Sequence, residues 1–164
     1  MSIKNKKILL AVVFVAVLAV AAVLIVTQSG NKAEPKETLP LNDAAKKVFS
    51  DLDSLTAYDG EELYDIVGVA PEDYTEFVYR TGENDIGLIA REIILVRAKD
   101  GEAVNRVLEA LSRYRERRQT ETRTYAPDIY AMLEKSAVSR KDLTAALIIS
   151  EDSAKETQSF LAGE

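Results

Sequence analysis

The feature that most constrains this chain is an uninterrupted apolar run of 19 residues, Ile8 to Val26. At about 1.5 Å per residue, a helix of this length crosses most of the roughly 30 Å hydrocarbon core of a bilayer. Lys4, Lys6 and Lys7 precede the run, and basic flanks of a membrane span tend to stay in the cytoplasm. The sequence therefore predicts a cytoplasmic basic tail (1–7), a transmembrane signal-anchor helix (8–26) in the cell membrane, and an extracytoplasmic remainder.

A cleaved signal peptide is the alternative interpretation of the same segment. Signal peptides usually have an apolar region of about 7 to 15 residues that ends in a small-x-small site. Here the run is longer and is followed by Thr27-Gln28-Ser29, so an uncleaved anchor is favoured; cleavage would make the protein secreted. Residues 27–41 contain Gly30, Pro35 and Pro40 without apolar periodicity, and we expect a flexible linker there.

The remainder of the chain is acidic. All 27 Asp and Glu residues lie from Glu34 onward, whereas four of the 21 Lys and Arg residues precede it, so residues 34–164 have a net charge of −10. Nucleic-acid binding needs a basic surface for the phosphate backbone. We therefore expect no nucleic-acid partner.

The missing residue types narrow the chemistry further. The chain contains no Cys and no His. Disulfides, thiolate catalysis and Ser-His-Asp catalysis are therefore excluded, as is nearly every kind of zinc site. The sequence predicts no catalytic residue, no cofactor and no metal site, and we expect a protein that is not an enzyme.

Residues 42–164 leave room for one domain, and their apolar periodicity predicts an α+β fold with a small, mainly antiparallel sheet packed with helices. Asn42, Asp100 and Ser150 are suitable N-caps, Pro127 fits the first turn of a helix, and Gly68 fits a helix end. The predicted helices are 42–53, 59–68, one from Asp100, 127–135 and one from Ser150, and the predicted strands are 74–80, 89–96, 137–140 and 143–150.

Several cues in this order resemble a family of exported proteins of Gram-positive bacteria. They are Glu92-Ile93-Ile94-Leu95 before the Lys99-Asp100-Gly101 turn, the Arg-rich helix end, Tyr125-Ala126-Pro127-Asp128 and the terminal apolar strand. Over roughly residues 42–159 the chain resembles number four-three-five-eight in the domain-of-unknown-function series. Many members look like lipoproteins; this chain lacks the Cys that bears the lipid, so its apolar helix would supply the anchor. The chain also has Arg140-Lys141-Asp142-Leu143 where a Gly-containing turn followed by Tyr is expected. The resemblance implies location and fold and assigns no catalytic residue.

One basic cluster stands out in the acidic domain: Arg113, Arg115, Arg117, Arg118 and Arg123. Guanidinium groups bind phosphate and carboxylate well, so the cluster can be interpreted as a site for an anionic partner such as lipid headgroups or a wall polymer. The alternative is that these cations complement the C-terminal dipole of a helix, which requires no partner and is the favoured interpretation.

The acidic residues and the tyrosines suggest no specific site. The spacing of Asp51, Asp53, Asp59, Glu61 and Glu62 is not that of a calcium-binding EF-hand loop, and solvated helix ends explain it better. No pair of carboxylates suited to sugar hydrolysis can be selected from the sequence. We expect the seven tyrosines at the edge of the core, with Tyr125 supporting the connection before Pro127.

The leading hypothesis is therefore a membrane-anchored, non-catalytic protein-interaction module at the bacterial cell surface, with a protein partner that the sequence does not identify. Two alternatives remain open. One is binding of a polyanion, lipid or wall polymer through the cluster that begins at Arg113 and includes Arg118. The other is a small carboxylate-dependent enzyme that acts on the cell wall.

Overall fold

A computed structural model of the protein describes residues 39–163. The predicted tail, the anchor helix and the linker up to residue 38 lie outside these residues. Within the described part, no helix is both long enough and apolar enough to cross a bilayer.

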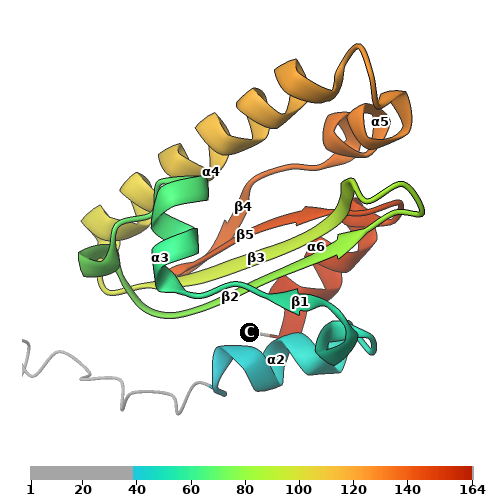
Figure 1. The fold of residues 1–164 in the computed structure, drawn as a ribbon. Helices are drawn as coiled ribbons and strands as arrows, with labels where there is room; N and C mark the ends of the chain where they lie inside the picture. Colours follow the sequence, from blue (N-terminus) through green and yellow to red (C-terminus); the bar gives the residue numbers. More distant parts are fainter. Residues whose placement is uncertain (1–38, 164) are drawn as a thin grey trace, which may run out of the picture. The chain divides into compact units, whose positions relative to one another are not determined.

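The described residues contain a five-stranded antiparallel sheet with the strand order β1-β2-β3-β5-β4 (Figure 1). The strands are β1 (Thr56–Ala57), β2 (Tyr74–Glu83), β3 (Ile89–Ala98), β4 (Ser139–Lys141) and β5 (Thr144–Ile149). The predicted α+β class and the two predicted antiparallel pairs are thereby confirmed. The short edge strand β1 was not predicted, because two exposed residues carry no alternation that a pattern could reveal.

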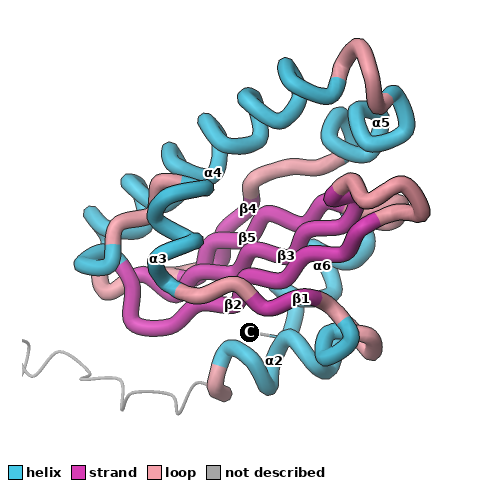
Figure 2. The backbone as a smooth tube through the Cα atoms, in the orientation of Figure 1, coloured by secondary structure: helices cyan, strands magenta, loops and turns pink. Residues whose placement is uncertain are grey.

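Helices cover both faces of the sheet (Figure 2). They are α2 (Leu41–Val48), α3 (Gly60–Glu62), α4 (Gly101–Thr122), α5 (Pro127–Lys135) and α6 (Ser153–Gly163). The helices α3, α4 and α5 lie on one face, and α2 and α6 lie on the other. A π-helical turn, Leu63–Val67, continues α3 and ends at Gly68, whose φ of 86° is in the left-handed region that favours glycine.

Strand β3 is apolar on both faces because both of its faces are covered. Ile94 and Val96 pack with α4 and α5, and Ile93 and Leu95 pack with α2 and α6. All four side chains are fully buried. Two hydrophobic clusters, one on each face, therefore hold the helices against the sheet.

Two predicted helix starts have local capping interactions, whereas Asn42, predicted as an N-cap, lies inside α2, whose N-cap is Pro40. Asp100 accepts hydrogen bonds from the backbone N–H groups of Glu102 (3.0 Å) and Ala103 (2.8 Å) and begins α4 as expected. Asp59 and Glu62 form a capping box at the start of α3, which confirms the interpretation of these acids as helix-end residues.

Two predicted helices have different boundaries. The helix predicted over 42–53 is interrupted, since α2 ends at Val48, Phe49 is extended and a separate 3-10 helix covers Leu52–Ser54. The last helix begins at Ser153 rather than after Ser150, because the Ser150 hydroxyl donates to the Glu156 carboxylate instead of capping the helix.

Candidate functional site

The five arginines of the predicted cluster do not form one surface, because three of them reach from α4 to different parts of the fold. The Arg115 guanidinium donates to the Leu133 carbonyl (2.9 Å from Nη2) and to the Ser136 hydroxyl (3.0 Å from Nε) at the C-terminal end of α5. Arg117 donates to the Ile66 carbonyl in the π-helical turn. These two arginines therefore bind the carbonyl ends of neighbouring helices.

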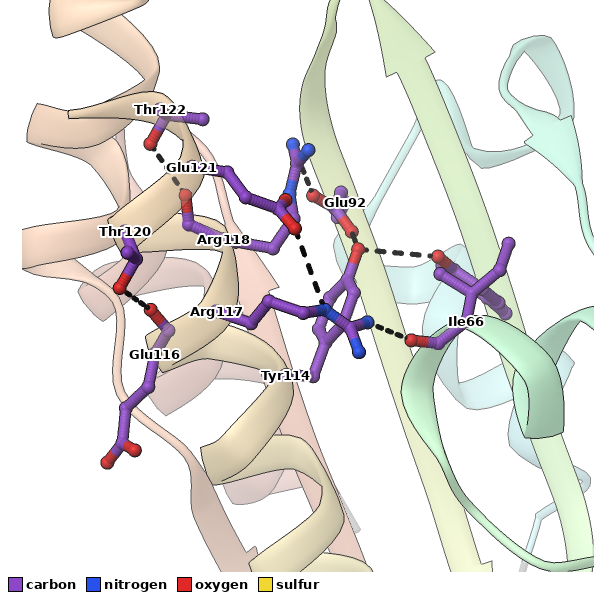
Figure 3. Close-up of polar contacts among 10 residues, drawn as sticks. Ile66, Glu92, Tyr114, Glu116, Arg117, Arg118, Thr120, Glu121 and Thr122 are labelled. Atoms are coloured by element: carbon purple, nitrogen blue, oxygen red, sulfur yellow. Dashed lines mark hydrogen bonds and ion pairs between the residues drawn. The ribbon is translucent and has the colours of Figure 1, made fainter. Parts of the chain in front are cut away.

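Arg118 reaches the sheet, where it meets a buried carboxylate (Figure 3). Its Nη2 lies 3.0 Å from Oε1 of Glu92 in β3 and donates to the Ile89 carbonyl at 2.9 Å. The hydroxyl of Tyr114, one turn earlier on α4, donates to the other carboxylate oxygen of Glu92. Tyr79 in β2 lies behind Tyr114, with their hydroxyl oxygens 3.5 Å apart. This buried polar cluster connects α4 with two strands.

The remaining two arginines lie at the surface. Arg113 forms a loose ion pair with Glu109 (3.6 Å) on the same helix, and Arg123 is exposed just after α4. The last turn of α4 contains no basic residue and Arg123 is its C-cap, so of the five arginines only Arg123 lies where it can complement the dipole of its own helix. Arg115 and Arg117 instead act on the carbonyl ends of other elements.

The polar cluster has a distinctive electrostatic state. Glu92 is 0% exposed. This burial raises the pKa of the Glu92 carboxyl, although the Arg118 charge and the Tyr114 hydrogen bond act in the opposite direction. Burial also raises the pKa values of the Tyr114 and Tyr79 hydroxyls, and the nearby Glu92 charge adds to that rise. Both tyrosines therefore stay protonated and act as hydrogen-bond donors.

Glu92 was not predicted as a buried group, although two signals in the sequence pointed to it. Glu92 is two residues from Ile94 and four from Val96, so the three side chains share one face of a strand that is apolar on both faces. Tyr114 and Arg118 continue the helical spacing of Val107 and Leu111, so they lie on the face of α4 that packs on the sheet. A charged side chain at a core position requires a partner. Arg118, on the same face of α4 as Tyr114, is that partner.

A hollow of about 240 Å³ lies beside this cluster, at the end of the sheet where the chain turns from β2 to β3. Residues from the turn, from the end of α4 and from α5 line it: Gly87, Leu88, Ile89, Arg118, Thr122, Tyr125 and Ile129. Two large apolar side chains at this end are exposed, Ile86 by 77% and Tyr125 by 61%. We call this hollow, together with Ile86 and Tyr125, the remote surface.

The described residues also form larger hollows with different linings, among them one of about 330 Å³ next to Arg91 and Glu156. One of about 500 Å³ lies between α2 and α6, where Lys47, Lys155, Asp152 and Glu156 surround Phe160. One of about 320 Å³ lies at the opposite end of the sheet from the remote surface, next to Arg97, Lys99 and Leu143. None of these is lined by a residue of the buried polar cluster, whereas Arg118 lines the hollow of the remote surface.

The acidic stretch is dispersed among separate interactions. Asp51 pairs with Arg91 (2.6 Å), Asp53 pairs with Lys46 (2.9 Å), and Asp59 caps α3. Within residues 39–163, no group of three or more acidic side chains is arranged to hold a metal ion.

The tyrosines differ from the prediction in their burial: two are more buried than expected, and one is more exposed. Tyr79 and Tyr114 lie inside the core rather than at its edge. Tyr125 was expected to support the connection before Pro127, but its ring is mostly exposed. The connection is held instead by the backbone, through the Ala126 N–H that donates to the Thr122 carbonyl at 2.9 Å.

A family model described as "Domain of unknown function (DUF4358)" matches residues 49–150. The matched region includes β2, β3, α4, α5 and β5, and with them the polar cluster and the remote surface. No curated protein and no solved structure matches the chain.

Proposed function

The chain belongs to the family described as Domain of unknown function (DUF4358), and on that premise we propose that it is a membrane-tethered, non-catalytic module that binds a protein partner outside the cytoplasm. The predicted anchor helix over residues 8–26 would hold it at the bacterial cell surface. The α+β domain would carry the binding surface.

The observation that carries this proposal is the separation between the point of attachment and the remote surface. The Leu39 carbonyl accepts a hydrogen bond from Arg97 Nη2 (3.0 Å), so the chain joins the domain at the C-terminal end of β3. Ile86 and Tyr125 lie at the other end of this ten-residue strand, about 30 Å away at roughly 3.3 Å per residue. The end of the sheet farther from Leu39 therefore carries Ile86 and Tyr125, the two most exposed large apolar side chains among residues 39–163, whereas Leu39 and Leu143 at the near end are less exposed. We take this difference as support for a contact surface at the far end.

The buried polar cluster supports a structural role rather than a catalytic one. A general acid or base must come within hydrogen-bond reach of the substrate, either directly or through one water. Glu92, the carboxylate with the raised pKa, is fully buried behind Tyr114 and Arg118. Its environment therefore favours anchoring α4 to the sheet over acid–base chemistry.

The arginines support a polyanion site less well than a protein contact. Arg115, Arg117 and Arg118 all use guanidinium N–H groups on backbone carbonyls of the domain itself. A polymer of phosphates or carboxylates would have to compete with those internal bonds. Of the three, Arg118 is also paired with Glu92.

Affinity purification of the tagged full chain from solubilised membranes tests the proposal. We expect a stoichiometric protein partner that is lost when Ile86 and Tyr125 are both replaced by Ser. The matched control replaces Tyr64, which is 53% exposed on the turn after α3, and should keep the partner. Recovery of no partner, together with turnover of a cell-wall fragment by the purified protein, would contradict the proposal.

A further inference from the structure

The turn between β2 and β3 holds Ile86 in a fixed outward position. Asn84 Oδ1 accepts hydrogen bonds from the N–H groups of Ile86 (3.2 Å) and Leu88 (2.9 Å). The Asn84 N–H donates to the Leu88 carbonyl (2.8 Å), and the Gly87 N–H donates to the Asn84 carbonyl (2.9 Å). Gly87 has a φ of 75°, which closes the turn without a steric penalty. A partner that contacts Ile86 therefore has little ordering entropy to overcome.

The hollow beside this turn has the size of a single side chain. Its volume of about 240 Å³ is below the roughly 300 Å³ at which pockets for drug-sized ligands begin. Leu88, Ile129 and the ring of Tyr125 supply apolar walls, and the Arg118 guanidinium in the wall is already paired with Glu92. This lining favours an apolar side chain of a partner over a free anion.

The surroundings of the hollow are acidic. Glu83 and Asp85 flank the turn that carries Ile86, and Asp128 lies in the first turn of α5, between Tyr125 and Ile129. All three are exposed, and none forms an ion pair or a side-chain hydrogen bond with any of residues 39–163. Arg123 is an exposed cation of the same connection, and Arg118 in the wall of the hollow is already paired with Glu92. The exposed side chains beside the hollow therefore include more carboxylates than cations. Together with the net charge of −10 over residues 34–164, this balance favours a positively charged partner.

We propose that the remote surface binds a basic segment of a partner protein, with one apolar side chain of that segment in the hollow and its Lys or Arg residues against Glu83, Asp85 and Asp128. The exposed face of Tyr125 can also receive a cation. This inference rests on the proposed function, because it specifies the chemistry of the protein partner.

Site-specific photo-crosslinking in the full, membrane-inserted chain tests the inference. A benzophenone amino acid is placed at position 86 or 125, and at position 64 as the control. Each version is combined with the charge reversal E83K/D85K/D128K or with the matched reversal E61K/E72K/E134K, which changes three exposed acids elsewhere in the domain by the same total charge. The crosslinked peptide of the partner is identified by mass spectrometry.

We expect adducts from positions 86 and 125 with one protein segment that is net positive and carries an apolar residue at the linkage. The adduct yield should fall about tenfold in E83K/D85K/D128K and stay within about twofold in E61K/E72K/E134K. An acidic segment, an adduct with lipid or glycan, or equal sensitivity to both reversals would overturn the inference. A protein adduct from position 64 alone would overturn it while leaving the proposed function intact, whereas no protein adduct from any position would contradict both.

Discussion

At the scale of single residues, two buried carboxylates with arginine partners have opposite electrostatic behaviour. Asp73 accepts three hydrogen-bond contacts from the Arg106 guanidinium, at 2.7, 3.0 and 3.1 Å, and these bonds hold the pKa of its carboxyl below the usual range. Glu92 meets Arg118 through one oxygen only and is fully buried, so the cost of burial prevails and raises its pKa. The balance between the depth of burial and the directed hydrogen bonds thus decides which effect dominates: desolvation prevails at Glu92, and the Arg106 hydrogen bonds prevail at Asp73.

The raised pKa of Glu92 makes a prediction with a definite sign. Between the ordinary glutamate pKa, about 4.3, and the higher folded value, the folded state binds more protons than the unfolded state. The stability contributed by protonated Glu92 is therefore complete below about pH 4.3 and is lost as the pH rises through the folded pKa, by up to about 1.4 kcal/mol per pH unit. Gln does not titrate at this position. The free energy of unfolding of Glu92→Gln minus that of the unaltered protein should therefore rise with pH. Urea unfolding between pH 4 and pH 8 measures this difference; a difference independent of pH would contradict it.

Asp73→Asn provides the opposite case and serves as the control for that series. Because the folded pKa of Asp73 is lowered, its stabilising contribution is present above the ordinary aspartate value, about 3.9, and is lost as the pH falls through the folded value. Asp73→Asn should therefore destabilise the protein at pH 7, and its effect should shrink in acid. If both variants respond to pH with the same sign, the assignment of the two environments is wrong.

At the scale of elements, α4 organises the domain through side chains that end on other elements. Arg115 binds the C-terminal end of α5, Arg117 binds the turn after α3, and Arg118 binds β3. Carbonyl groups at a helix end lack partners within their own helix, and a guanidinium can satisfy two of them or one together with a hydroxyl. Arginines that are close together in sequence therefore contact three different elements of the fold.

Replacing Arg115 should lower the free energy of unfolding far more than replacing Arg113, although both belong to the same cluster. Arg115→Ala removes hydrogen bonds from a charged donor to Leu133 and Ser136 and should lower the free energy of unfolding by about 1.5–3 kcal/mol. Arg113→Ala removes a loose, exposed pair with Glu109 and should cost less than about 0.5 kcal/mol. Denaturant unfolding of the two variants provides the comparison, and equal losses would show that Arg115 does not hold α5.

Elements were predictable from the sequence where the deciding interaction is local. Asp100, Pro127 and Gly68 each act within their own turn, so α4, α5 and the end of the turn after α3 were placed correctly. The helix 42–53 was extended too far because Phe49 and Leu52 keep helical spacing in sequence, while an extended residue and a 3-10 turn bring them into the core. Ser150 was wrongly predicted as an N-cap because its hydroxyl donates a hydrogen bond to the side chain of Glu156, six residues later.

At the scale of the whole molecule, composition and periodicity predicted the class of fold but not its site. An acidic α+β domain with an antiparallel sheet follows from residues that alternate or repeat along the chain. The remote surface does not, because Tyr125 is 38 residues from Gly87 in sequence, and the two residues line one hollow only through the packing of α4 and α5 on the sheet. Exposure of a large apolar side chain depends on what the rest of the fold leaves uncovered.

The attachment of the domain provides the last prediction. Lys4, Lys6 and Lys7 before the apolar run predict a cytoplasmic N-terminus, and residues 42–164 should be accessible from outside the cell. Protease added to intact cells stripped of their wall should therefore degrade a C-terminal tag and leave an N-terminal tag protected. Moving these three lysines to positions just after Val26 should weaken or invert this pattern, because the charge difference across the span sets its orientation. Protection of both tags would contradict the proposed topology. If the N-terminal tag separates from a domain recovered in the medium, the segment is a cleaved signal peptide, and partner binding would then have to occur without a tether.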